Sequence, residues 1–220
     1  MSWARDLLGG DGARAHQPRD VLIERLRHDP RISTDAVEAI ARVEREMFVP
    51  KQHRELAYED VALEIGPVAT ISAPSMVAEM LTALNLTADL SVLEIGGGSG
   101  YAAATIAAYR DRVVSIEVQP ELAEQARRNL DRAGFSDLVR TVTADGRWGW
   151  PESAPYDRIL VSASVDAVPQ AWLDQLAPGG ILVYPESGPG EDLLVRLTRA
   201  QDKGLVREIM GRCRFVRMQL

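Results

Sequence analysis

The chain has 220 residues and a mass of 24.1 kDa, which is the size of one domain. Its apolar fraction of 46% and charged fraction of 26% are typical of globular proteins and exclude a disordered or fibrous chain. The net charge of −7 and the pI of about 5.1 disfavour nucleic acid and anionic membrane surfaces as partners.

The first part of the chain is expected to be helical. Glycines near the start indicate a flexible tail over residues 1–17. Residues 18–60 show apolar side chains at helical spacing, which predicts a first helix from residue 18 and a second over 34–45. Ser33 and Thr34 are the candidate N-caps of the second helix.

The remainder, residues 61–220, alternates β-rich runs with helical patterns and is expected to form the α/β core of a single domain that spans residues 18–220. Alternation of this kind predicts a doubly wound, mostly parallel sheet, here of seven strands, with helices on both faces. The strands are expected at 91–95, 113–117, 138–143, 158–161, 181–184, 193–198 and 205–218, with helices at 101–109, 120–133 and 169–176. Ligands bind beyond the carboxyl ends of such strands, so the residues there are the first candidates for chemistry.

Cysteine and histidine usage narrows the chemistry. The single cysteine, Cys213, excludes an internal disulfide and a multi-cysteine metal site, and it favours a reducing, cytoplasmic compartment. The three histidines have no ligand-like spacing, so no metal is expected. The N-terminus lacks the apolar core of a signal peptide, and no apolar run reaches the roughly 20 residues of a membrane span.

A glycine-rich loop, residues 96–100, follows the strand at 91–95. Glycine lets the backbone turn sharply and approach a ligand closely, and the loop leads into a helix N-terminus. Glu117 ends the next strand, about 20 residues after the loop, where a carboxylate suits the two hydroxyls of a ribose. The arrangement predicts a nucleoside-type cofactor.

Two further acidic residues favour S-adenosylmethionine over NAD. Glu94 lies at the approach to the loop, where it would repel a pyrophosphate but accept a cationic amino-acid group. Asp145, followed by Gly146, comes after the third strand, where its carboxylate can accept from an adenine amino group. No cation near the loop would neutralise the pyrophosphate of NAD, so an NAD-dependent oxidoreductase is the minor alternative.

From about Val37 to Phe215 the chain resembles the protein-L-isoaspartate O-methyltransferases, a family of class I S-adenosylmethionine-dependent enzymes. The most specific segment is Thr-Ile-Ser-Ala-Pro-Ser-Met at residues 70–76, whereas many methyltransferases share the glycine loop. Further segments that resemble the family are 45–50, 57–60, 92–101, 145–151, 176–180 and 214–216.

The resemblance implies transfer of a methyl group from S-adenosylmethionine to the free α-carboxylate of an L-isoaspartyl residue in a damaged protein or peptide. It also implies that Ser72 is the active-site hydroxyl. A carboxylate acceptor is already ionised at neutral pH, so a general base is not required. The competing interpretation of Ser72 is a helix N-cap. The cofactor contacts expected from motif and resemblance together are Thr70, Ile71, Glu94, Gly96, Gly98, Gly100, Glu117, Asp145 and Gly146.

The C-terminal motif departs from the family, which usually has proline after its Phe-Val pair, whereas this chain has Arg217. Val216 and Arg217 are the expected substrate-binding residues, with Arg217 as a candidate cation for the acceptor carboxylate. The departure keeps open a same-fold methyltransferase that acts on an aspartate of one dedicated peptide. A non-catalytic S-adenosylmethionine-binding protein is the third possibility. The chain is expected to be a monomer.

Overall fold

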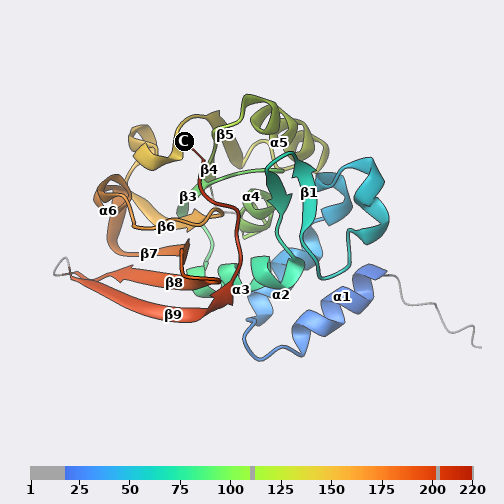
Figure 1. Cartoon of the computed structure of the whole chain (residues 1–220), viewed down its shortest axis with the longest axis horizontal. Coiled ribbons are helices and arrows are strands. Elements are labelled where there is room, and N and C mark those ends of the chain that lie inside the picture. Colours follow the sequence, from blue (N-terminus) through green and yellow to red (C-terminus); the bar gives the residue numbers. More distant parts are fainter. Residues whose placement is uncertain (1–17, 110–111, 202–203, 220) are drawn as a thin grey trace, which may run out of the picture.

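The computed structural model describes residues 18–109, 112–201 and 204–219, so the tail predicted over residues 1–17 lies outside it. Its centre is a seven-stranded sheet in the order β5-β4-β3-β6-β7-β8-β9 (Figure 1). The neighbouring pairs from β5 to β7 are parallel, and β8 and β9 add two antiparallel strands. The predicted doubly wound, mostly parallel sheet is therefore confirmed. The strands are β3 (Ser91–Ile95), β4 (Arg112–Glu117), β5 (Val139–Thr143), β6 (Tyr156–Val161), β7 (Leu176–Glu186), β8 (Asp192–Arg199) and β9 (Leu205–Cys213).

The predicted helices are all present, together with an additional helix, α3 (Pro74–Leu84). Ser33 caps the second helix, because its side chain accepts a hydrogen bond from the Ala36 amide. That helix ends at Arg42, earlier than predicted, and a short 3₁₀ helix follows it. The α-helices are α1 (Pro18–Arg27), α2 (Thr34–Arg42), α3 (Pro74–Leu84), α4 (Tyr101–Ala107), α5 (Pro120–Arg132) and α6 (Gln170–Gln175). The 3₁₀ helices are η1 (Arg45–Phe48), η2 (Lys51–Leu56), η3 (Gly146–Trp148) and η4 (Pro151–Ser153).

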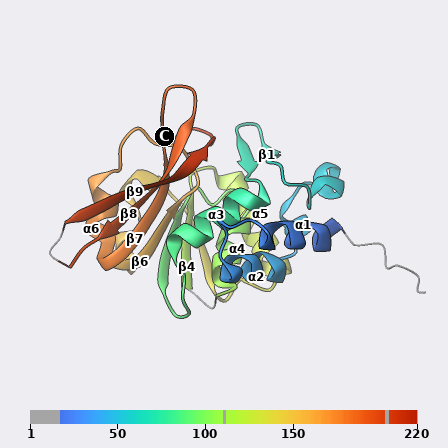
Figure 2. The ribbon, with the colours of Figure 1, turned by 90° about the horizontal axis from the view of Figure 1, so that it is seen from below.

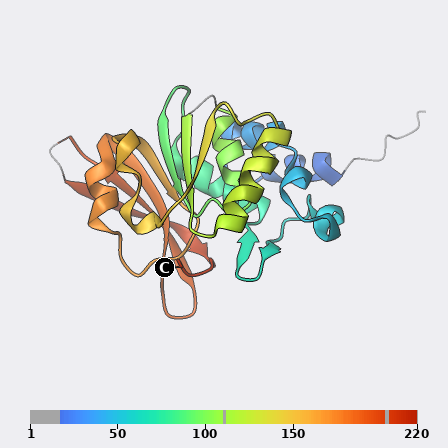
Figure 3. The ribbon, with the colours of Figure 1, turned by 90° about the horizontal axis from the view of Figure 1, so that it is seen from above.

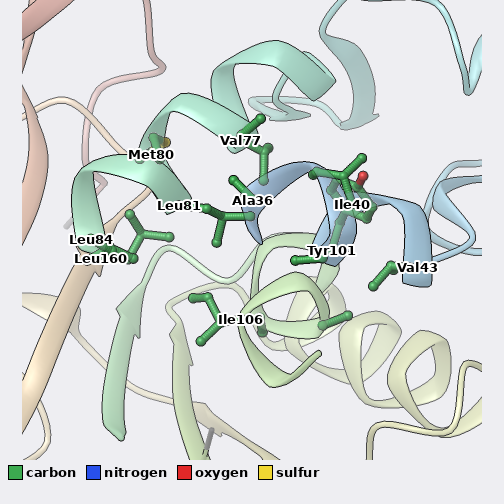
Figure 4. Close-up of a cluster of buried hydrophobic side chains, with 14 of the residues drawn as sticks. Ala36, Ile40, Val43, Val77, Met80, Leu81, Leu84, Tyr101, Ile106 and Leu160 are labelled. Atoms are coloured by element: carbon green, nitrogen blue, oxygen red, sulfur yellow. The ribbon is translucent and has the colours of Figure 1, made fainter. Parts of the chain in front are cut away.

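Alternate side chains of the central strands enter two different hydrophobic clusters, because successive residues of a strand point to opposite faces. Val92 packs in the cluster that includes α2, α3 and α4, whereas Leu93 packs in the cluster with Trp172 of α6. Figure 4 shows the first cluster, where side chains of α2 and α3 meet those of α4 and Leu160. Figures 2 and 3 show helices on both faces of the sheet. In the described part of the chain, no helix combines the length and apolar character needed to cross a membrane.

A short antiparallel hairpin, β1 (Leu63–Gly66) and β2 (Ala69–Ile71), was not predicted from the sequence. Its strands have only four and three residues, and their register shifts between Glu64 and Gly66, so no alternating pattern develops. The hairpin stands apart from the large sheet, beside its carboxyl-end edge (Figure 3). It brings the segment that precedes α3 to the site described below.

Two strand boundaries differ most from the prediction. The last strand ends at Cys213 rather than at residue 218, because its partner β8 begins at Asp192, opposite Cys213. The Asp192 carboxylate accepts the Phe215 amide at 2.9 Å, and the chain then leaves the sheet. Strand β7 begins at Leu176, so the Pro-Gly-Gly turn at residues 178–180 lies within an irregular stretch of this strand.

Leu81 of α3 tests how much the first cluster stabilises the fold, because its side chain is fully buried there. We expect Leu81→Ala to lower the free energy of unfolding by about 3 kcal/mol, through lost burial and the cavity left behind. Urea unfolding measures the change. Leu56→Ala, at a side chain that is 45% exposed, is the control and should stay within about 0.5 kcal/mol of the parent. Equal effects of the two changes would contradict this assignment of the core.

Candidate active site

Two adjoining pockets lie at the carboxyl ends of the parallel strands. They share Thr70, Gly96, Gly98 and Ser162. The outer pocket is lined by residues 68–70, Ile95, Gly96, Gly98, residues 116–119, Gly146, Ser162, Ala163 and residues 216–219. The inner pocket is lined by residues 70–72, Val77, Met80, Glu94, residues 96–99, Tyr101, Ala102, Leu160 and Ser162.

The glycine loop between β3 and α4 forms the wall that the two pockets share. The amides of Gly96 and Gly97 both donate to the Ile116 carbonyl at 2.9 Å, which ties the loop to the end of β4. Gly98 has a φ of +52°, a left-handed conformation that favours glycine. A Cβ on Gly97 would overlap the Ser115 hydroxyl. The glycines therefore permit both the turn and its close approach to β4.

Glu117, at the end of β4, has a buried carboxylate that lines the outer pocket. Its Oε2 accepts the Gly98 amide at 2.8 Å, and its Oε1 accepts the Gln119 amide at 3.0 Å. A carboxylate has about four acceptor positions, so two remain for a ligand. This geometry suits the pair of ribose hydroxyls expected from the sequence.

Glu94, at the end of β3, has a fully buried carboxylate in the wall of the inner pocket. Its Oε2 accepts a hydrogen bond from the Ser115 hydroxyl, and its Oε1 has no hydrogen-bond partner among the described residues. Burial raises the pKa of this carboxyl to about 8, and the nearby charge of Glu117 acts in the same direction. A ligand cation would meet an acceptor oxygen that the protein itself leaves unsatisfied.

Ser72 lies between β2 and α3 and lines the inner pocket together with the glycine loop. The N-cap of α3 is Ala73, which makes no side-chain cap bond. The Asp60 carboxylate instead accepts a hydrogen bond from the Ser75 amide at 2.9 Å. A residue 15 positions earlier in the chain thus satisfies a backbone N–H group in the first turn of α3. The helix-cap interpretation of Ser72 is therefore wrong. Among the described residues its hydroxyl has no hydrogen-bond partner, which leaves it available to a ligand.

Most of the other expected cofactor residues also line these pockets. Thr70, Gly96 and Gly98 line both, Ile71 lines the inner pocket, and Gly146 lines the outer one. A Cβ on Gly146 would lie 2.5 Å from Ile95 Cγ2, so only glycine fits there.

Asp145 and Gly100 line neither pocket. The Asp145 carboxylate binds the Arg147 side chain, with Nη2 at 2.6 Å, and Arg147 lowers the pKa of this carboxyl. Gly100 has a φ of +87°, and its Cα faces Leu130 of α5, where a Cβ would lie 3.1 Å from Cγ. Its role in the fold is the close approach of α4 to α5.

The C-terminal segment, residues 214–219, runs past the end of β6 and closes one side of the outer pocket. The Ser164 amide donates to the Val216 carbonyl at 2.8 Å, and the Met218 amide donates to the Ser164 carbonyl at 3.0 Å. The side chain of Gln219 accepts a hydrogen bond from Gln119 at 3.2 Å. These bonds place both Val216 and Arg217 at the pocket.

Arg217 already has a carboxylate partner. Its Nη1 donates to the carboxylate of Asp166 and to the Ser187 hydroxyl, the latter at 2.7 Å, and it lowers the pKa of the Asp166 carboxyl. Its charge is thus balanced within the protein, which differs from the free cation expected from the sequence.

Some lining residues were not predicted. Ser162 and Ala163 follow β6, and the strand-end rule could have identified them. Val68 and Ala69 enter through the unpredicted hairpin, and Met218 enters through a segment predicted as strand. Among the described residues, no group of three or more His, Cys, Asp or Glu side chains lies close enough to hold a metal ion.

Comparisons with known proteins find similar sequences and a shared fold. The family model described as protein-L-isoaspartate(D-aspartate) O-methyltransferase matches residues 17–219. A protein-L-isoaspartate O-methyltransferase of Geobacter metallireducens is 42% identical over 208 residues, which cover 94% of each chain. A solved structure titled protein-L-isoaspartate O-methyltransferase aligns with a TM-score of 0.82 at 32% identity, over 90% of this chain and 65% of that one. A Plasmodium falciparum structure in complex with S-adenosyl-L-homocysteine has a TM-score of 0.79 at 22% identity over 91% of this chain and 98% of that one, and shows the shared fold.

Glu94 makes the stability of the ligand-free protein dependent on pH. Because burial raises the pKa of its carboxyl from 4.5 to about 8, the folded protein holds a proton that the unfolded chain releases between those values. The stability that this proton contributes is complete below pH 4.5 and is lost as the pH rises through 8. Relative to a Glu94→Gln variant, the parent should therefore lose stability from pH 5 to 8, with a slope approaching about 1.4 kcal/mol per pH unit.

Urea unfolding of both proteins at pH 5, 6, 7 and 8, without cofactor, measures the difference. A constant difference over that range would show that Glu94 does not titrate there.

Proposed function

Because the chain belongs to the protein-L-isoaspartate(D-aspartate) O-methyltransferase family, we propose that it transfers a methyl group from S-adenosylmethionine to the α-carboxylate of L-isoaspartyl residues in damaged proteins. The observation that carries the proposal is the inner pocket, which is lined both by Ser72 and by the glycine loop with Glu94, whose Oε1 has no hydrogen-bond partner among the described residues. An acceptor carboxylate and a cationic methyl donor find complementary groups there.

The residues at the two pockets fit S-adenosylmethionine, which supplies a methyl group on a sulfonium. The free Oε1 of Glu94 is placed to accept from the cationic α-amino group, and the remaining acceptor positions of Glu117 suit the ribose. The outer pocket offers apolar walls, Ile95 and Met218, to the adenine ring. Glu94 and Glu117 are thus the residues that we expect to bind the cofactor most strongly.

In the reaction, the chain positions the two reactants and excludes water from the reacting atoms. The acceptor carboxylate needs no base, so a neutral hydroxyl from Ser72 can hold one oxygen while the other faces the methyl group. Ile71, Val77 and Met80 line the same pocket with apolar surface, which keeps water from the reacting atoms. This arrangement explains why a nucleophile–base pair is unnecessary.

Arg217 supports a second candidate, methylation of an aspartyl residue in one dedicated peptide. Its pairing with Asp166 and Ser187 builds a polar edge on the outer pocket, at the position where the family usually has proline. Such an edge can select one peptide sequence. A non-catalytic role is disfavoured, because the Ser72 hydroxyl remains free in a formed pocket.

We also propose that the protein is a cytoplasmic monomer. The buried Cys213 is a free thiol, and burial raises its pKa to about 12, which suits an unreactive thiol in a reducing compartment.

A matched pair of peptides tests the substrate. With labelled S-adenosylmethionine, we expect methyl transfer to an isoaspartyl peptide and a much lower kcat/KM for its aspartyl twin, because the acceptor carboxylate sits at a different distance from the backbone in the two isomers. Equal or reversed preference would favour the dedicated-peptide function and would overturn general repair.

Ser72→Ala tests the positioning hydroxyl. Loss of one hydrogen bond to a charged carboxylate should lower kcat by about 10- to 100-fold. Binding of S-adenosylhomocysteine, measured by calorimetry, should remain close to that of the parent. Ser75→Ala is the control, because Ser75 is three residues away and lines neither pocket. Unchanged turnover in Ser72→Ala would remove Ser72 from the mechanism.

A further inference from the structure

A third cavity, of about 280 Å³, lies between η2 and α5 on the far side of the hairpin from the outer pocket. Three basic side chains line it, Lys51 and Arg54 from η2 and Arg132 from α5, and none of its lining residues is acidic. Apolar residues such as Phe48, Ile65 and Leu122 complete its walls. We call it the cationic cavity.

The charges of the cationic cavity are available to a ligand. Lys51 and Arg54 are three residues apart in a 3₁₀ helix, so their side chains project from the same side. Within the described part of the chain, neither has an ion-pair partner, whereas exposed arginines such as Arg127 and Arg128 pair with Glu124. The chain as a whole carries a net charge of −7, so this cluster of unpaired cations is a local departure from its overall charge.

Arg132 is held in position from behind. Its Nη2 donates to the Met47 carbonyl at 3.1 Å and to Asn129 Oδ1 at 2.6 Å, while the Asn129 amide donates to the Ser99 carbonyl at 2.9 Å. Asn129 is buried, so it forms a fixed link from the cationic cavity to the glycine loop. The cavity is thus built onto the element that shapes the active site.

The cationic cavity adjoins the inner pocket, here called the acceptor site because Ser72 lines it. Ile65 of β1 lines the cavity, and its Cδ1 lies 3.3 Å from the position of a Cβ on Gly98, which lines both active-site pockets. Ser99 lines both the cavity and the inner pocket. Figures 1 and 3 show the hairpin between the C-terminal segment and the cyan segment that contains η2. A peptide bound at the acceptor site therefore has only a short distance to span before one of its side chains reaches the cationic cavity.

We propose that the cationic cavity is an exosite for an acidic side chain of the protein substrate, a Glu or Asp that lies within a few residues of the isoaspartyl residue. The apolar walls take the methylene groups of that side chain, and Lys51, Arg54 and the free Nη1 of Arg132 take its carboxylate. This exosite rests on the proposed function, because it assumes a peptide substrate at Ser72. It gives an acidic enzyme a local means to retain substrates that its overall charge repels.

The test uses a series of isoaspartyl peptides that carry one Glu at different distances on either side of the isoaspartyl residue, each with a Gln twin. At the best offset, the Glu peptide should have a KM about 2- to 10-fold below that of its twin, as expected for two partly exposed ion pairs. In Lys51→Gln/Arg54→Gln this preference should disappear, while kcat and KM for the Gln peptides stay close to those of the parent.

The matched control is Arg127→Gln/Arg128→Gln, which makes the same change in net charge on α5 but outside the cavity. It should keep the preference, and equal loss in both double variants would overturn the exosite in favour of general electrostatics. Equal KM values for Glu and Gln peptides at every offset would also overturn it. If inorganic phosphate binds the parent but not Lys51→Gln/Arg54→Gln while the peptides show no preference, the cavity holds a small free anion instead. Absence of turnover with every isoaspartyl peptide would overturn the proposed function itself, a separate result.

Discussion

The burial of two carboxylates at the ends of adjacent strands is the constraint on which the site depends. A buried acid needs hydrogen-bond donors, and the two carboxylates receive very different sets of them. Glu117 receives two backbone amides, so its charge is satisfied and its position is fixed. Glu94 receives one hydroxyl and retains one oxygen without a partner, and burial raises its pKa to about 8. One acid therefore shapes the loop, and the other is left to be completed by a cation.

The glycine loop follows from the same constraint. For Glu117 to accept the Gly98 amide, the chain must turn back toward β4 directly after β3, with Gly96 and Gly97 bonded to the Ile116 carbonyl. A side chain on Gly97 would collide with Ser115, the residue that donates to Glu94. The close loop and the two acids are thus one unit. The hairpin and the C-terminal segment then enclose it from outside the strand–helix alternation.

The sequence predicted those parts of the site that follow from strand ends. Glu117 and Gly146 could be found because parallel strands bring their carboxyl ends to one edge of the sheet, whatever the details of packing. Asp145 also follows a strand end, but its side chain binds Arg147 instead of lining a pocket. The strand pattern does not predict the orientation of a single side chain. The hairpin is too short to show a period, and the Arg217–Asp166 pair joins residues 51 positions apart. Interactions of this range depend on the assembled fold.

Arg45 connects the helical N-terminal part of the chain to the helix that follows the glycine loop. Its guanidinium is 1% exposed and lies 4.9 Å from the ring centre of Tyr101, the first residue of α4 after the glycine loop. Among the described residues its Nε and Nη1 have no hydrogen-bond partner. The aromatic face of Tyr101 and the Val61 carbonyl therefore provide most of the stabilisation of its buried charge. A buried charge tolerates little displacement of the groups that compensate it. The 3₁₀ helix η1 and the helix α4, which begins at Tyr101 directly after the glycine loop, are therefore held in one fixed relation.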